Sequence, residues 1–221
     1  MKKTLALLVA LAGVFTSTAQ AQDAKAGEKK VAMCIGCHGI PGYKANFPQV
    51  YKVPMIAGQN AKYIATALTE YRGGDRRHPT MRAIAASLSD ADIADVAAYY
   101  ESLGKKVQTA PVPAMLESPV PEALKAKLTA CTACHGANFN TPNDPSIPRL
   151  SGQHADYLAQ ALRAYQIGGD AGDTRHPIVG RVNATMSGMA KTLSEAELHQ
   201  VADYLAGLPG ELHTVPQSRT R

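Results

Sequence analysis

The stretch Cys34-Ile35-Gly36-Cys37-His38 returns later in the chain as Cys131-Thr132-Ala133-Cys134-His135, and the two stretches hold all four cysteines of the 221 residues. C-x-x-C-H is the attachment signature of c-type haem. Its two thiols, three positions apart on one helical turn, reach the two vinyl groups of a porphyrin, while the adjacent imidazole points at the iron. The sequence therefore predicts two haem c groups, each attached through two thioethers. The attaching residues are Cys34, Cys37, Cys131 and Cys134, and the adjacent iron ligands are His38 and His135.

Other uses of paired cysteines fit this chain less well. An exported protein normally spends an even cysteine count on disulfides, a thioredoxin-like pair needs a βαβ context, and a zinc site uses four Cys/His ligands from paired knuckles. No βαβ pattern is present, and each half holds a complete haem motif. A porphyrin in each half also explains how a chain with no Trp and 5% aromatic residues builds two small cores.

The composition bounds the remaining possibilities. With 45% hydrophobic and 19% charged residues, the chain is neither disordered nor collagen-like nor a multi-span membrane protein. Residues 1–21 are typical of a secretory signal, with an apolar run that ends in the small-residue site Ala19-Gln20-Ala21. We expect cleavage after Ala21 and a periplasmic location. The net charge of +5 comes without basic runs interleaved with aromatics, so we expect no nucleic-acid partner.

The halves of the mature chain repeat each other. Residues shared by the two units at nearly constant offsets include Pro54, Gly58, Gln59, Tyr63 and Tyr71, matched by Pro148, Gly152, Gln153, Tyr157 and Tyr165. Residues 105–120 between the units are rich in proline and favour an extended connector. We therefore expect one domain over 22–104, a linker over 105–120 and a second domain over 121–221.

Each unit shows the same helical plan. A first helix, about 24–37 or about 121–134, ends in the haem motif. A Pro/Gly-rich loop leads to a second, tyrosine-bearing helix, and both this helix and the last one carry an apolar stripe at helical spacing. After a Gly-Gly break, the last helix opens with a capping box, Ser89-x-x-Asp92 or Ser194-x-x-Glu197. No strand pattern competes, so the sequence predicts an all-α fold with the helices packed around haem.

The sixth iron ligand decides the chemistry. An open iron binds gases or peroxide, whereas His/Met ligation suits electron transfer at a raised potential. Met81 and Met186 each stand seven residues before a Leu-Ser pair, so we expect both to be ligands on the loop that leads into the last helix. Met189 is the rival in the second unit, but it aligns with Ile84.

Two histidines remain as alternative ligands. His78 and His176 align within Arg77-His78-Pro79 and Arg175-His176-Pro177, although we favour a surface or propionate-contacting role for them. We expect His154, His199 and His213 to be solvated, and Met33, Met55 and Met115 to fill the core.

The neighbourhood of each haem can also be predicted. The carbonyls of Pro54 and Pro148 are placed to accept the Nδ1 protons of His38 and His135, which would fix the two rings. The candidates for propionate contacts are Arg77, Arg175, Tyr63, Tyr157, Gln59 and Gln153.

The order of these motifs resembles that of the cytochrome c4 family. C-x-x-C-H is followed by Pro-x-x-Ala/Ser-Gly-Gln at 54–59 and 148–153, a tyrosine helix, Gly-Gly and a methionine loop, over nearly the whole mature chain. The resemblance implies two class I cytochrome c domains in tandem, related by a pseudo-twofold axis, with propionates facing each other across the interface. It also implies the axial pairs His38 with Met81 and His135 with Met186. The loop from Pro177 to Met186 is longer than that from Pro79 to Met81, which departs from an exact repeat.

Three functions are compatible with these features. We expect a periplasmic carrier without enzyme activity that moves electrons between redox proteins such as a cytochrome bc1-type complex and a terminal oxidase. Any association with the membrane would be peripheral and mediated by these partners. The alternative is the di-haem subunit of a dehydrogenase such as flavocytochrome c sulfide dehydrogenase, which a large exposed apolar patch would favour. A di-haem peroxidase needs an open or His-rich iron, and two methionine ligands speak against it.

Overall fold

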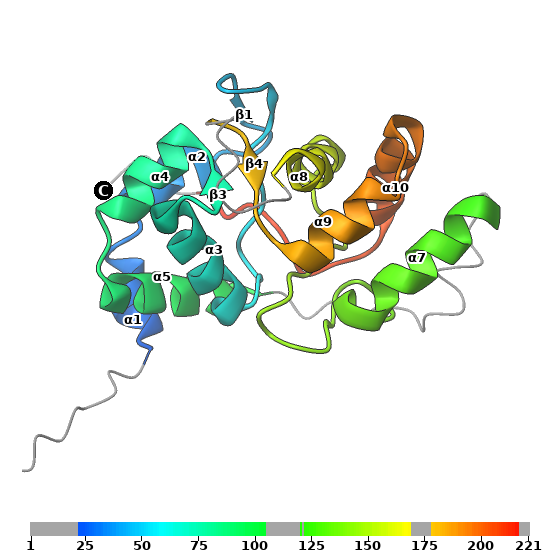
Figure 1. The fold of residues 1–221 in the computed structure, drawn as a ribbon. Coiled ribbons are helices and arrows are strands. Elements are labelled where there is room, and N and C mark those ends of the chain that lie inside the picture. The colour runs from blue at the N-terminus through cyan, green and yellow to red at the C-terminus, as the bar shows by residue number, and fades with distance from the viewer. Residues whose placement is uncertain (1–21, 105–119, 121, 169–177, 217–221) are drawn as a thin grey trace, which may run out of the picture.

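The computed structural model describes residues 22–104, 120, 122–168 and 178–216. Four predicted features lie outside the described residues: the signal segment, nearly all of the linker, Met115, and the Arg175-His176-Pro177 stretch. Figure 1 shows the helices of the first unit on one side, those of the second on the other, and the strands β3 and β4 between them. The described residues are mostly helical, as predicted, with a few two-residue strands added.

Among its described residues, the first domain contains five α-helices and three two-residue strands, in the order α1 (Ala24–Glu28), α2 (Ala32–His38), β1 (Lys44–Ala45), β2 (Tyr51–Lys52), α3 (Ala61–Gly73), β3 (Arg76–Arg77), α4 (Pro79–Ala86) and α5 (Asp90–Ser102). The expected single helix over 24–37 is wrong, because α1 ends in a tight turn in which the Lys29 amide donates to the Ala26 carbonyl. Packing explains the break: α1 lies on α5, and Lys30 in the turn bonds to Asp92 and Asp95 of α5, each at 2.7 Å.

The second domain repeats this plan with an unbroken first helix. Its elements are α7 (Glu122–His135), α8 (Ala155–Ile167), β4 (Gly180–Arg181), α9 (Ala184–Lys191) and α10 (Glu195–Gly207). Both predicted capping boxes are confirmed, since Ser89 and Ser194 cap α5 and α10 and their amides bond back to Asp92 and Glu197.

Each domain has its own apolar core. The first joins α3 to α5 through buried Ile64, Leu68, Ile93 and Val96. The second joins α7, α8 and α10 through buried side chains that include Leu128, Leu158, Leu198 and Val201. The apolar stripes predicted for the second and last helices therefore face these cores.

The two domains meet through backbone pairing as well as side chains. β3 and β4 pair antiparallel across the boundary, and the Val182 amide donates to the Asp75 carbonyl at 2.7 Å. The chain after α10 returns to the first domain, where the His213 amide donates to the Ala57 carbonyl at 3.2 Å. His213 is thus half-buried instead of solvated, because it belongs to this returning segment.

Two of the remaining histidines and two methionines differ in how far they are buried. His199 is exposed and pairs with Glu195 at 3.2 Å, as expected for a surface residue, whereas His154 is half-buried at the start of α8. Met33 does not fill the core, since 51% of its surface is exposed on α2, and Met55 is half-buried at the domain boundary.

Candidate haem-binding sites

The two thiol pairs lie on the last turns of α2 and α7. Cys34, Cys131 and Cys37 are half-buried and Cys134 is exposed, and none forms a disulfide. Burial raises the pKa of the Cys34 and Cys131 thiols. Each pair therefore stays as free thiols on one helical face, directly before the histidine, which is the arrangement that thioether attachment requires.

The two histidines are held in the same way. His38 Nδ1 donates to the Pro54 carbonyl at 2.9 Å, and His135 Nδ1 donates to the Pro148 carbonyl at 3.0 Å, so the expected role of both carbonyls is confirmed. Within the described residues, neither Nε2 has a hydrogen-bond partner. Burial lowers the pKa of both rings. Each imidazole is thus neutral, with Nε2 left for a metal.

The two methionines occupy equivalent places near helix N-termini, not on a loop. Met81 lies in the first turn of α4, where its amide donates to the His78 ring at 3.3 Å, and Met186 lies in the first turn of α9, where its amide donates to Asn183 Oδ1 at 3.0 Å. The expected loop is wrong because a capping side chain starts a short helix at each place. Met189, one turn further along α9, has no such counterpart in α4.

The caps also correct the repeat. His78 matches Asn183, not His176, because both residues are the N-caps of equivalent helices. The alignment of His78 with His176 was the argument for a pair of histidine ligands, and this equivalence removes it.

Two arginine–tyrosine stacks stand between the domains. The Arg76 guanidinium lies 5.5 Å from the Tyr63 ring centroid and 5.2 Å from that of Tyr71. Arg181 lies 5.5 Å from Tyr157 and 5.4 Å from Tyr165 in the second domain. Arg76 and Arg181 are therefore the equivalent arginines of the two domains, in the place where the repeat had pointed to Arg77 and Arg175. The sequence does contain a signal for this equivalence. Arg76 and Thr80 stand at the same distances before Met81 as Arg181 and Thr185 stand before Met186.

Gln59 and Gln153 were expected near propionates, but they reach across the boundary instead. Each bonds to the backbone of the other domain, Gln59 to Arg149 and Gln153 to Met55. Tyr63 and Tyr157 remain beside the arginines, whose guanidinium groups donate to the two phenol oxygens at 2.7 and 3.2 Å.

Comparison with known proteins identifies this duplicated arrangement. A family model described as Cytochrome c matches residues 24–104 and again 124–209. Cytochrome c4 from Azotobacter vinelandii is 31% identical over 94% of this chain and 100% of its own length. The chain belongs to the cytochrome c4 family.

Other relatives extend this family assignment. The crystal structure of reduced recombinant cytochrome c4 from Pseudomonas stutzeri aligns with a TM-score of 0.59 and 29% identity, covering 86% of this chain and 100% of that one. A protein named thiosulfate dehydrogenase electron acceptor, from Thiomonas intermedia, is 30% identical over 95% of this chain and 92% of its own length. As a cytochrome c4 relative with two cytochrome c domains, this chain is a di-haem electron-transfer protein with two covalently bound c-type haems.

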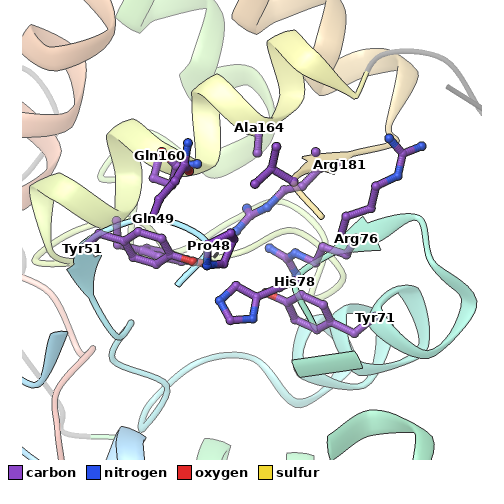
Figure 2. Close-up of a pocket in the computed structure, with 13 residues that line it drawn as sticks. Pro48, Gln49, Tyr51, Tyr71, Arg76, His78, Gln160, Ala164 and Arg181 are labelled. Atoms are coloured by element: carbon purple, nitrogen blue, oxygen red, sulfur yellow. Dashed lines mark hydrogen bonds between the residues drawn. The ribbon is translucent and has the colours of Figure 1, made fainter. Parts of the chain in front are cut away.

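The pocket between the domains fits the acidic edge of such haems. Figure 2 shows Arg76 and Arg181 among the side chains that line it, with Tyr71 and His78 on the side of the first domain. Arg76 is 3% exposed, its Nε has no partner, and its nearest carboxylate, Glu70, is 3.8 Å away. A buried cation with an unused donor calls for an anion. The propionates of covalently bound haems would meet that need.

In the part of the chain that the structure describes, no helix is both long and apolar enough to cross a membrane.

Proposed function

We propose that this chain is a periplasmic carrier whose irons are ligated by His38 with Met81 and by His135 with Met186. Cys34 and Cys37 would attach the first haem, and Cys131 and Cys134 the second. The observation that carries the proposal is the duplication of the whole site. Both domains contain the same four features in the same order: a thiol pair, a histidine anchored by a proline carbonyl, an arginine stacked on tyrosines, and a capped helix that carries a methionine.

The residues of each site have separate tasks in this proposal. When bound, each haem supplies an iron that takes up and releases one electron. His38 and His135, kept neutral by burial, would each hold one iron at Nε2, while Pro54 and Pro148 fix the rings. Met81 and Met186 would close the opposite faces, so that no substrate reaches an iron. Transfer is then outer-sphere, with no bond made or broken.

The partners proposed are redox proteins of a respiratory chain. A cytochrome bc1-type complex would supply the electrons and a terminal oxidase would take them. Export to the periplasm is supported by the signal-like segment at residues 1–21. Cell fractionation tests the location. Periplasm, cytoplasm and membranes are separated, and each fraction is stained for haem protein with the mass of the chain without its signal segment. Haem-stained protein in the cytoplasm would contradict it.

Optical spectroscopy of the purified protein tests the ligands. We expect the weak near-infrared charge-transfer band of methionine-ligated ferric haem, and no carbon monoxide binding to the reduced protein. Rapid carbon monoxide binding, or a missing band, would mean an open or bis-His iron and would return enzyme activity to consideration.

A second candidate function is that of a docked electron acceptor for a dehydrogenase. Large apolar side chains gather on one segment of the first domain: those with at least two-fifths of their surface exposed there are Met33, Ile40, Tyr43, Phe47 and Val50. This segment runs from α2 through the β1–β2 hairpin, next to the first haem motif. Such a patch favours lasting contact with a partner, and the relatives named thiosulfate dehydrogenase electron acceptor fit this role.

Purification from the native host separates the two candidates. A free carrier elutes alone at low and high salt. A docked acceptor elutes with an enzyme, and Phe47→Ser together with Val50→Ser should release it without changing either haem spectrum.

A further inference from the structure

Two buried glutamines cross the domain boundary in opposite directions. Gln153 Oε1 accepts from the Met55 amide at 3.0 Å, and its Nε2 donates to the Met55 carbonyl at 2.8 Å. Gln59 makes the same pair of bonds with Arg149, at 2.9 and 3.1 Å. Both side chains belong to residues that are only 4% exposed. Each carboxamide therefore binds one residue of the other domain at two points.

The bonded residues are not arbitrary. Met55 directly follows Pro54, so the Met55 N–H and the Pro54 C=O belong to one peptide group. That C=O accepts the Nδ1 proton of His38 at 2.9 Å. In the second domain, the Arg149 N–H and the Pro148 C=O form one peptide group, and His135 donates to it at 3.0 Å. Each glutamine thus ends a hydrogen-bond chain that begins at the histidine of the opposite domain.

Such a chain is cooperative. An acceptor on the N–H side of a peptide group draws its proton and increases the negative charge on the carbonyl oxygen, which strengthens the bond that the oxygen accepts. A stronger Nδ1–H···O bond makes an imidazole a more electron-rich ligand and holds its ring orientation. An electron-rich ligand favours the ferric state and lowers the reduction potential.

We propose that Gln153 is a positioning residue for His38 and Gln59 a positioning residue for His135, so that each domain sets the potential of the iron in the other. The inference rests on the axial histidines of the proposed function. Its signature is crossed: the loss of one glutamine alters the haem of the opposite domain and not that of its own. If the glutamines only held the domains together, the loss of one glutamine would not alter the haem of the opposite domain alone.

Matched variants of the full-length protein with both haems test this inference. Gln153→Met and Gln59→Met keep the length of the side chain but remove the acceptor and the donor. Asp156→Ala is the control, because Asp156 accepts across the same boundary from the Lys52 amide at 3.0 Å without touching either proline peptide. The measurements are the potential of each haem, followed by its methyl NMR shifts during redox titration, and the Nδ1 proton resonances of the ¹⁵N-labelled reduced protein.

The expected result for Gln153→Met is a higher potential of the first-domain haem and an upfield shift of the His38 Nδ1 proton, with the second haem unchanged. Gln59→Met should do the reverse, and Asp156→Ala should move neither. Shifts in the haem of the variant's own domain, equal shifts in both haems, or no shift would overturn the inference.

Two further measurements on the wild-type protein separate a failure of this inference from a failure of the proposed function. If the Nδ1 protons of His38 and His135 lack the shifts of iron-bound imidazole, the axial assignment has failed. If these shifts are present but the variants leave them unchanged, only the inference has failed. Should the variants not fold, scalar coupling across the hydrogen bond between the Met55 nitrogen and the Gln153 side-chain carbon is compared in the oxidised and reduced protein. A coupling that changes with the oxidation state of the first haem supports the inference, and an equal coupling in both states overturns it.

Discussion

Arg76 and Arg181 stand opposite each other as register partners in the antiparallel β3–β4 pair. Each arginine stacks on two tyrosines of its own domain, and both line the pocket between the domains. Two cations at one boundary would repel each other if nothing offset their charge. In the proposed function, the negatively charged edges of the two haems would meet beside this pair and offset its charge.

Removing the charge of Arg76 should lower the potential of the first haem. A nearby cation destabilises ferric iron, and a unit charge within about 10 Å is worth about 1 to 2 kcal/mol at an effective dielectric constant of about 20. We expect Arg76→Leu to lower the midpoint potential accordingly, as measured by spectroelectrochemistry.

Arg77→Leu is the matched comparison for this prediction, because Arg77 is the neighbouring arginine of β3 and carries the same charge, but is half-buried where Arg76 is buried. It should lower the potential less. An equal or larger effect of Arg77→Leu would return the propionate role to Arg77.

Met81→Ala should open the first iron alone. Loss of the thioether leaves a coordination position free and lowers the potential of that haem. We expect the reduced variant to bind one carbon monoxide molecule per chain, and Met186→Ala to do the same at the second haem. Met189→Ala is the control and should bind none. If Met189→Ala binds carbon monoxide and Met186→Ala does not, the second-domain ligand is Met189.

The cap of α4 should tolerate asparagine but not alanine. The His78 ring accepts from the Met81 amide, and Asn183 does so for Met186 in the second domain. We expect His78→Ala to destabilise the first domain by about 1 kcal/mol, and His78→Asn to recover most of this loss. Guanidinium unfolding followed at each haem band measures both. An unchanged methionine band in His78→Asn would further show that His78 is not an iron ligand.

Acid should weaken the same ion pair in both domains. Lys30 bonds to Asp92 at 2.7 Å and Lys127 bonds to Glu197 at 2.5 Å, so that in each domain a lysine shortly before the haem motif is joined to a capping-box carboxylate. The lysine hydrogen bond, helped by the serine of the box, lowers the pKa of Asp92 and of Glu197 to about 2. A lowered folded-state pKa stabilises the fold above the unfolded value, about 3.9 for Asp and about 4.3 for Glu.

This stabilisation is therefore present above about pH 4 and is lost as the pH falls towards 2. Melting temperatures measured between these limits should fall less steeply for Lys30→Met and Lys127→Met than for the wild type. The variants should also melt earlier at neutral pH. Parallel pH curves for variant and wild type would show that the two pairs contribute nothing.

Local patterns were enough for much of this protein. The C-x-x-C-H motifs, the apolar stripes and the Ser-x-x-Asp and Ser-x-x-Glu boxes each depend on residues within one or two helical turns, and the structure places the helices and caps where those patterns predict. The proline carbonyls that anchor His38 and His135 were also predictable, because a repeat constrains both copies at once.

Long-range pairing lay beyond those patterns. The second domain has extra residues between α8 and β4, so Arg-His-Pro occurs twice in the sequence without occupying equivalent positions. The sequence therefore offers two competing matches, and the β3–β4 register and the two helix caps decide for Arg76 with Arg181 and His78 with Asn183.

The sequence by itself determined that two haems are attached, that each haem motif lies at the end of a helix, and how the last helices begin, since these depend on neighbours along the chain. The tertiary structure alone decided which arginines face each other and that Gln59 and Gln153 bond to the opposite domain. The physical reason is that a buried carboxamide takes whichever partner the packing of the two domains brings within hydrogen-bond distance, and the partners of Gln59 and Gln153 are 90 and 98 positions away in the chain.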